Sequence, residues 1–163
     1  RERHIIDSAQ AIDLIDLNDT ICSDLGSGGG LPGIVLAIMM KKLNKSMKFK
    51  LYEKSHLKSM FLKNVSRKLN LNTEVIEEDI FERNNLRSET VIGRAFKPLP
   101  VILELMDKNF SKYKNLILFM GKNGKQTLND AFKTWKFEYK EKMSLTSDDS
   151  FLISIKNIKK KIE

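Results

Sequence analysis

The sequence predicts an α/β fold: a seven-stranded, mostly parallel sheet with one antiparallel strand and with helices on both faces. Three observations lead to this expectation. Short apolar segments rich in β-branched residues alternate with segments of helical period, which is typical of a parallel sheet. A glycine turn, "DLGSGGGLPG" (24–33), separates one such strand from the next helix, as in nucleotide-binding βα units. Two strands close the chain with no helix between them, which indicates an antiparallel strand inserted at the end of the sheet.

Local signals place the individual elements. Pro32 suits the first turn of a helix, where its missing N–H is not needed, and "MKFKLYE" (47–53) alternates as a strand does. Ser55 is a good helix N-cap, and five apolar residues of the helix that follows are expected to share a buried face: Leu57, Phe61, Leu62, Val65 and Leu69. The predicted strands are 20–25, 47–53, 73–78, 90–95, 115–120, 134–144 and 150–157. The predicted helices are 2–15, 32–43, 56–70, 98–110 and 125–132.

Length and composition fit one globular domain. The 163 residues are enough for a single domain (1–163) with a buried core. The longest apolar run, Ile34 to Met40, is too short to span a bilayer, so no membrane partner is expected. The opening "RERHIIDS" has no signal-peptide pattern and lacks an initial Met, so we expect a fragment of a longer protein.

Charge and metal-ligand patterns narrow the function classes. The net charge of +8, from 29 basic and 21 acidic residues, favours a polyanionic partner such as nucleic acid, although a biased genome would give the same composition. The only cysteine, Cys22, lies in the predicted first strand and reads as a small buried hydrophobe. With one cysteine and two distant histidines, His4 and His56, no metal site is predicted.

The ligand of the glycine turn has two interpretations. The spacing Gly28-x-Gly30-x-x-Gly33, with Glu53 about 20 residues further on, fits a dinucleotide-binding fingerprint and a nucleotide-dependent oxidoreductase. Asp24 weighs against it, because an acid ahead of the turn would repel a pyrophosphate at the helix N-terminus. The chain also leaves no room for a separate dehydrogenase substrate domain.

S-adenosylmethionine suits these acids better, since it carries a sulfonium and an ammonium but no phosphate. Gly26, Gly28 and Gly30 would let the backbone approach the cofactor. Glu53 would accept hydrogen bonds from the ribose hydroxyls, and Asp79 would lie near the adenine edge. With Asp24, these acids follow three successive strands and would share one crevice. The alternative for Glu53 and Asp79 is a role as solvated loop acids.

Three segments in this order, "RHIIDS" (3–8), "DLGSGGGLPGI" (24–34) and "GRAF" (93–96), closely resemble the bacterial 16S ribosomal RNA guanine-N7 methyltransferase family, also called glucose-inhibited division protein B or RsmG. The likeness covers essentially the whole chain, and family members usually carry a further helical segment before "RHIIDS". The resemblance implies a class I S-adenosylmethionine-dependent methyltransferase (Rossmann-like) fold. It also implies cofactor contacts at Gly26, Leu31, Asp79, Ile80, Phe81 and Arg94.

Two positions depart from the family pattern. After the third strand the family usually has Arg, a small or apolar residue and Glu, where this chain has Asp79-Ile80-Phe81. After the fifth strand it usually has Lys-Gly, where this chain has Met120-Gly121 with Lys122 one step on. The departures keep one alternative open, a non-catalytic RNA-binding module with a degenerate cofactor fold.

The resemblance implies methyl transfer to N7 of a guanine in the decoding-region (530) loop of 16S rRNA. Guanine N7 is a lone pair with no proton to remove, so no catalytic base is required, and the enzyme mainly aligns the reacting atoms. Positioning is assigned to Arg94 and Phe96, the latter by stacking on the guanine or, alternatively, as a core residue. Arg94 is expected to clamp an anionic group of the cofactor or the RNA, with an ion pair to Asp7 or Asp24 as the alternative. Exocyclic-amine and C5-pyrimidine methylation are disfavoured by "RAFKPLP" (94–100) and by the place of Cys22.

The expected partner is 16S rRNA or a small-subunit assembly particle, bound by a cytoplasmic monomer. The basic side chains that follow the second strand and the fifth strand are candidate phosphate contacts, although a solvated face is the alternative for each: Lys54, Lys58, Lys63, Arg67 and Lys122.

Overall fold

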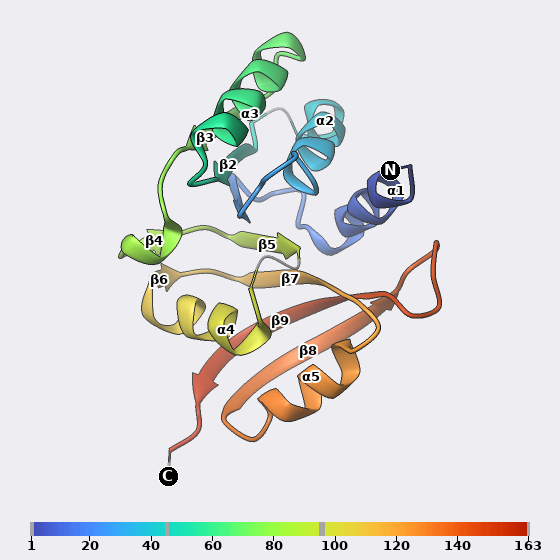
Figure 1. Ribbon diagram of the computed structural model, residues 1–163, viewed down its shortest axis with the longest axis vertical. Helices are drawn as coiled ribbons and strands as arrows, with labels where there is room; N and C mark the ends of the chain where they lie inside the picture. Colours follow the sequence, from blue (N-terminus) through green and yellow to red (C-terminus); the bar gives the residue numbers. More distant parts are fainter. Residues whose placement is uncertain (1, 45, 95–96, 163) are drawn as a thin grey trace.

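The computed structural model describes residues 2–44, 46–94 and 97–162. Within them, one seven-stranded sheet has the order β3-β2-β1-β5-β7-β9-β8, and a separate two-stranded sheet pairs β4 with β6 (Figure 1). The strands of the main sheet are β1 (Ile21–Leu25), β2 (Lys48–Tyr52), β3 (Thr73–Ile76), β5 (Thr90–Arg94), β7 (Asn115–Met120), β8 (Trp135–Met143) and β9 (Phe151–Lys160). The small sheet consists of β4 (Leu86–Arg87) and β6 (Phe110–Lys112).

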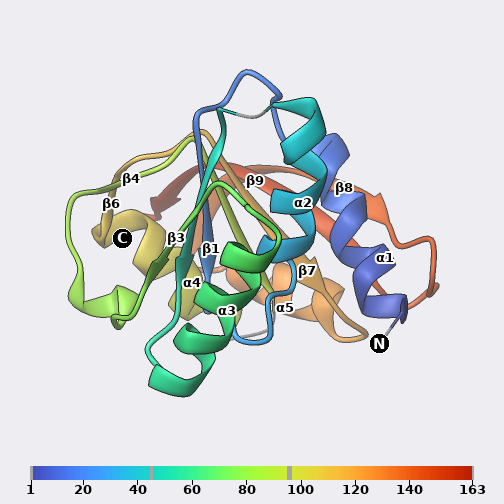
Figure 2. The ribbon, with the colours of Figure 1, turned by 90° about the horizontal axis from the view of Figure 1, so that it is seen from above.

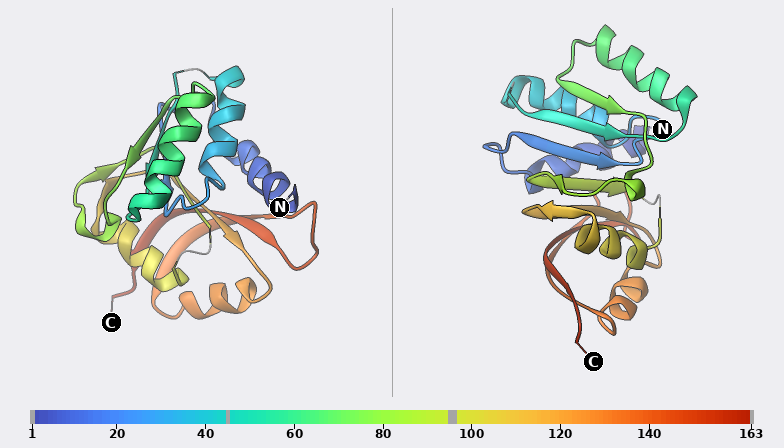
Figure 3. Two further views of the ribbon diagram at one scale, coloured as in Figure 1. Left: turned by 45° about the horizontal axis from the view of Figure 1, so that its top comes forward. Right: turned by 90° about the vertical axis from the view of Figure 1, so that its left-hand side faces the viewer.

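Helices cover both faces of the main sheet (Figures 2 and 3). One face carries α1, the 3-10 turn η1, α2 and α3, and the other carries α4 and α5. Their bounds are α1 (Glu2–Gln10), η1 (Ala11–Leu14), α2 (Gly33–Leu43), α3 (His56–Lys68), the short 3-10 turn η2 (Ile80–Glu82), α4 (Leu99–Lys108) and α5 (Gly124–Ala131).

The pairing of the strands confirms the predicted sheet. The first five strands in the sheet order pair in parallel, from β3 to β7. β9 then runs antiparallel to both of its neighbours, β7 and β8. The carboxyl ends of β1, β2, β3, β5 and β7 therefore meet at one edge of the sheet, where open α/β sheets bind their ligands.

The buried side chains form two cores, one on each face of the sheet. The larger joins β5, β7 and β9 to α4 and α5, with Leu103, Met106 and Leu116 fully buried. The smaller joins β1 and β2 to α2, with Phe49 and Leu36 fully buried. Strands that are buried on both faces explain why the sequence reads as short continuous apolar runs.

Some expectations differ from the structure. The predicted first helix becomes the 3-10 turn η1 in its last part, and the short strands β4 and β6 were not predicted. The prediction of which residues α3 buries was wrong. Ser55 caps this helix, accepting a hydrogen bond from the Lys58 N–H, but Leu57, Phe61 and Leu69 are exposed. The residues that α3 buries are Ser59, Leu62 and Ser66.

No helix in the described part of the chain is long and apolar enough to cross a membrane.

Candidate functional site

The glycine turn begins directly after β1 and needs glycine at three positions. Gly26, Gly28 and Gly30 have positive φ angles of 61°, 46° and 95°, in the left-handed region that side chains disfavour. A Cβ on Gly30 would also lie 2.9 Å from Cγ1 of Ile34. The backbone can therefore turn sharply from β1 into α2, which leaves the surface of the turn bare of side chains.

Asp24 supports this turn from below. Its side chain is fully buried, and Oδ2 accepts a hydrogen bond of 2.9 Å from the Gly33 N–H at the start of α2. Gly33 must stay small, because a Cβ there would lie 2.4 Å from Asp24 Oδ2 and 2.7 Å from Leu51. Burial raises the pKa of Asp24 to about 7. Hydrogen bonds from Ser27 and the Gly33 amide lower the pKa, and the negative charge of the nearby Glu53 raises it.

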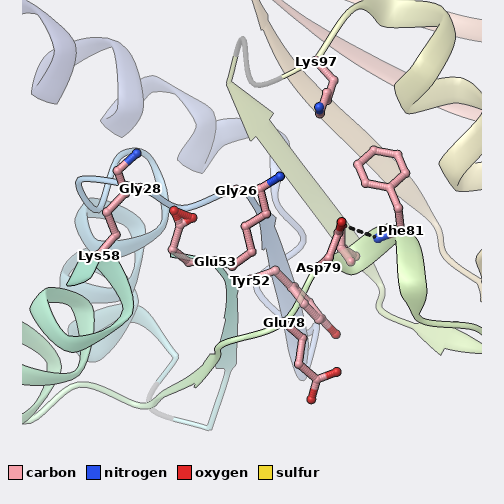
Figure 4. Close-up of a pocket in the computed structure, with 11 residues that line it drawn as sticks. Gly26, Gly28, Tyr52, Glu53, Lys58, Glu78, Asp79, Phe81 and Lys97 are labelled. Carbon is pink, nitrogen blue, oxygen red and sulfur yellow. Dashed lines mark hydrogen bonds between the residues drawn. The ribbon is translucent and has the colours of Figure 1, made fainter. Parts of the chain in front are cut away.

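A cavity of about 290 Å³ opens above the turn, at the carboxyl ends of β1, β2 and β3 (Figure 4). Its lining combines backbone of the turn, acids and basic side chains: Gly26, Gly28, Tyr52, Glu53, Lys54, Lys58, Glu78, Asp79, Ile80, Phe81 and Lys97. We call this space the first cavity. It lies at the position where this type of sheet binds nucleotides.

Glu53 is the most buried acid in that lining, at 8% exposed, directly after β2. Figure 4 shows its carboxylate turned toward the loop that carries Gly26 and Gly28. Tyr52 lies beside it, and burial raises the pKa of the phenol. A carboxylate next to bare backbone can accept hydrogen bonds from hydroxyl groups of a ligand.

Asp79 and Phe81 form the opposite side of the first cavity, after β3. The Phe81 N–H donates to Asp79 Oδ1 at 3.0 Å, so this acid fixes the start of η2. Lys97 stands over the Phe81 ring, with its Nζ 6.0 Å from the ring centroid. Together the two side chains border the first cavity where it faces β5 and α4 (Figure 4).

A second cavity of about 350 Å³ lies next to the first, after the ends of β5 and β7. Lys97 lines both cavities. The second cavity continues between the starts of α4 and α5 and is bordered by Leu118, Phe119, Met120, Lys122 and Asn123, among others. The two cavities could therefore hold two reactants side by side.

The structure gathers many of the predicted site residues but not all. Those that line the first cavity are Gly26, Gly28, Glu53, Lys54, Lys58, Asp79, Ile80 and Phe81. Asp24 lies under the turn, Leu31 is not part of the lining, and Lys122 borders the second cavity instead. Lys63 and Arg67 are exposed further along α3. Phe96 lies outside the described residues.

Arg94, at the end of β5, faces α1 rather than the first cavity. Its Nη2 donates to His4 Nδ1 at 3.0 Å and lies 3.9 Å from Asp7 Oδ2. Its Nη1 is 3.4 Å from the Ser8 hydroxyl. The motif "RHIIDS" and Arg94 of the motif "GRAF" therefore meet in space.

Three lining residues were missed by the sequence reasoning: Tyr52, Glu78 and Lys97. Tyr52 and Glu78 are each adjacent to a predicted acid, so sequence proximity could have indicated them. Lys97 follows β5, and nothing in the sequence relates it to the loop after β3.

Comparison with known proteins agrees with this geometry. The model of the family described as "GidB: rRNA small subunit methyltransferase G" matches residues 1–151. A ribosomal RNA small subunit methyltransferase G from Pelagibacter ubique (strain HTCC1062) is 58% identical over 161 residues, which cover 99% of this chain and 76% of the relative.

Solved structures of S-adenosylmethionine-dependent methyltransferases share the fold. M. capricolum TrmK in complex with S-adenosyl-homocysteine superposes with a TM-score of 0.65 at 18% identity, covering 92% of this chain and 66% of that one. A SAM-dependent methyltransferase from Aquifex aeolicus superposes with a TM-score of 0.67 at 14% identity, covering 93% of this chain and 90% of that one.

Proposed function

Because this chain belongs to the rRNA small subunit methyltransferase G family, we propose that it methylates N7 of a guanine in the decoding-region (530) loop of 16S rRNA. The family and the fold make it an S-adenosylmethionine-dependent rRNA methyltransferase. The pair of adjoining cavities at the carboxyl ends of the strands is the observation that carries the proposal, because methyl transfer needs a donor site and an acceptor site in contact.

The first cavity fits S-adenosylmethionine. Its bare glycine backbone allows a close approach, and Glu53 offers acceptors for ribose hydroxyls. Its lining holds three acids, Glu53, Glu78 and Asp79, beside three lysines. Glu53, whose carboxylate is turned toward the glycine turn, favours a sulfonium or an ammonium next to that turn over a pyrophosphate. The bound cofactor supplies an activated methyl group on its sulfonium sulfur.

The remaining residues that were predicted to bind the cofactor have other roles. Asp24 holds the turn in shape through Gly33, and above about pH 7 its carboxylate contributes negative charge beneath the ligand. Leu31 belongs to the turn, and its contact with the cofactor stays a prediction. Ile80 and Phe81 would border the adenine.

The second cavity would take the guanine. Leu118 offers an apolar surface, and Lys97 and Lys122 offer positive charge to the phosphates next to the target base. The chain needs no general base there, because N7 reacts through its lone pair. The protein only has to align the guanine with the methyl donor and to exclude water.

The surface around the cavities supports an RNA partner. Lys54 and Lys58 lie at the rim of the first cavity, and Lys63 and Arg67 extend the basic surface along α3. We propose that this surface binds the phosphates of 16S rRNA, in free RNA or in a small-subunit assembly particle, and that the protein acts as a monomer in the cytoplasm.

The test is methyl transfer from labelled S-adenosylmethionine to 16S rRNA and to 30S particles that lack the modification. We expect 7-methylguanosine at one position in the 530 loop, identified by nuclease digestion and mass spectrometry. Methylation of another atom or another loop would refute the proposed target. Calorimetric titration with S-adenosylhomocysteine and with NAD separately tests the cofactor, and only the first is expected to bind.

A further inference from the structure

Strands β8 and β9 have one face that the helices leave largely open. Successive side chains of a strand point to opposite faces, and Trp135, Phe137 and Ile155 point into the core that α4 and α5 cover, on the side of these strands where Figure 3 shows both helices. On the opposite face, α1 and η1 reach only one end, where Lys142 Nζ donates to the carbonyl of Gln10 at 2.9 Å. Beyond this end the face is exposed to solvent.

Four lysines occupy the exposed part of this face. Within the described residues, none of them forms an ion pair or a side-chain hydrogen bond. Glu138 is the one acid that shares the face on these two described strands, and its carboxylate accepts a hydrogen bond from Asn157. Asp13 on η1, beside the face, already pairs with Lys142. We call the four lysines the basic face: Lys136 and Lys140 on β8, and Lys156 and Lys159 on β9.

The basic face carries positive charge at a cost to the fold. Lys136 and Lys159 are register partners on the antiparallel strands, and like charges directly opposite each other destabilise a sheet. Lys140 and Lys156 are diagonal neighbours on the same ladder, about 7–8 Å apart. Other lysines of the chain are neutralised by an acid, for example Lys125 by Glu141. A bound polyanion would relieve the repulsion on the basic face.

The basic face lies away from both cavities. β9 is antiparallel to β7, and Phe151 pairs with Met120 at the edge of the sheet where the second cavity opens. Counting along β9 from Phe151, Lys156 lies roughly 17 Å and Lys159 roughly 25 Å from that edge. The second cavity also extends toward α4 and α5, on the other side of the sheet. A nucleotide on the basic face is therefore not a direct neighbour of a base in the second cavity.

We propose that the basic face is a second RNA-binding surface, which holds the sugar-phosphate backbone of 16S rRNA at nucleotides outside the target loop. This rests on the function proposed above, in which 16S rRNA is the substrate. Lysines attract phosphates without reading the base sequence. Because both surfaces would bind the same RNA molecule, contact at one raises the effective concentration of RNA at the other. The basic face thus adds affinity for a large folded RNA and leaves the chemistry at the cavities unchanged.

The central variant removes the charge of the basic face. It combines Lys136→Gln, Lys140→Gln, Lys156→Gln and Lys159→Gln. Filter binding of protein-free 16S rRNA should show at least tenfold weaker affinity at low salt, and the slope of log K against log salt should fall by about 3. At saturating RNA, kcat for methylation should stay within twofold of wild type, and so should the dissociation constant of S-adenosylhomocysteine.

A matched control removes the same charge from other exposed positions of the described chain. It combines Lys41→Gln, Lys42→Gln, Lys48→Gln and Arg87→Gln. It should change the affinity for 16S rRNA less than threefold. An RNA hairpin that contains only the 530 loop is too small to reach both surfaces, so it should bind the central variant and wild type within twofold of each other.

The single variant Lys136→Gln separates binding from folding. At low salt it should raise the melting temperature by about 1–2 °C, because Lys159 loses a like charge directly opposite it. The same change should weaken the binding of 16S rRNA. A lower melting temperature would contradict the argument that charge repulsion is stored in this part of the sheet.

The remaining outcomes overturn the proposal in different ways. Unchanged 16S rRNA affinity in the central variant, or an equal loss in the control, would exclude a specific role of the basic face. An equal loss for the hairpin would show that the basic face binds the target loop itself. Unchanged RNA affinity, with loss of binding to phosphatidylglycerol vesicles, would assign the basic face to a membrane. Failure of wild type to methylate 16S rRNA would refute only the proposed function, because RNA affinity is measured without methyl transfer.

Discussion

Asp24→Asn should make the protein more stable at neutral and alkaline pH. Asp24 is fully buried, its Oδ1 has no hydrogen-bond partner among the described residues, and its pKa is raised from 3.8 to about 7. Below about pH 4 the carboxyl is protonated in both the folded and the unfolded chain. As the pH rises toward 7, the unfolded chain loses this proton while the folded protein keeps it, so the free energy of unfolding falls.

The size of the effect follows from this difference in pKa. Between about pH 5 and pH 8, the contribution of Asp24 should lower the free energy of unfolding by about 2–3 kcal/mol. Asn cannot titrate, and its amide oxygen can still accept the Gly33 N–H. The stability difference between Asp24→Asn and wild type should therefore grow by about this amount over the same pH range.

Urea unfolding at several pH values measures the difference directly. Asp148→Asn, at an exposed position, is the control for the loss of one surface carboxylate. A stability difference that stays constant from pH 5 to pH 8 would refute the argument that burial keeps Asp24 protonated. In the same samples, S-adenosylmethionine should bind Asp24→Asn more weakly than wild type at pH 8, because the cationic ligand loses a nearby negative charge.

Three further predictions test the site. Glu53→Gln should weaken S-adenosylhomocysteine binding by about tenfold, or ~1.4 kcal/mol, with little change in melting temperature; an unchanged dissociation constant would remove Glu53 from the ribose site. RNA affinity should fall steeply with salt, and Lys58→Met should reduce the slope of log K against log salt by roughly 0.7–0.9, as expected for one phosphate contact; a flat plot for wild type would exclude an electrostatic footprint. Gly33→Ala should lower the free energy of unfolding by roughly 1–3 kcal/mol in urea, because its Cβ would lie 2.4 Å from Asp24 Oδ2; normal stability would contradict this tight contact.

The main sheet could be predicted from the sequence because its strands carry strong local signals. The β-branched run before the glycine turn and the strict alternation at 47–53 correspond to β1 and β2. The two strands after 134 lacked an intervening helix, which was enough to predict the antiparallel insertion. β4 and β6 have only two and three residues, too few for any period to be detected.

The site was predictable where it follows strand ends and unpredictable where it depends on packing. Glu53 comes directly after β2 and Asp79 lies in the loop that follows β3, so the topology alone places them in one cavity. For Arg94 the sequence left two alternatives, a clamp on an anionic group and an ion pair with Asp7 or Asp24. The structure shows Arg94 next to Asp7, a contact that depends on how α1 packs against β5. On α3 the apolar pattern was misleading: Leu57 is 80% exposed, and small serines occupy the buried positions, where a larger side chain would be expected.

The position of β9 affects how the chain can fold during synthesis. β9 follows β8 along the chain but lies between β7 and β8 in the sheet. Until β9 has left the ribosome, β8 has no strand to pair with and β7 presents an open edge. An open edge next to apolar side chains is a template for pairing with another chain. Nascent chains that stop before Phe151 would therefore be the most prone to aggregate, although they already contain the glycine turn and all residues lining both cavities.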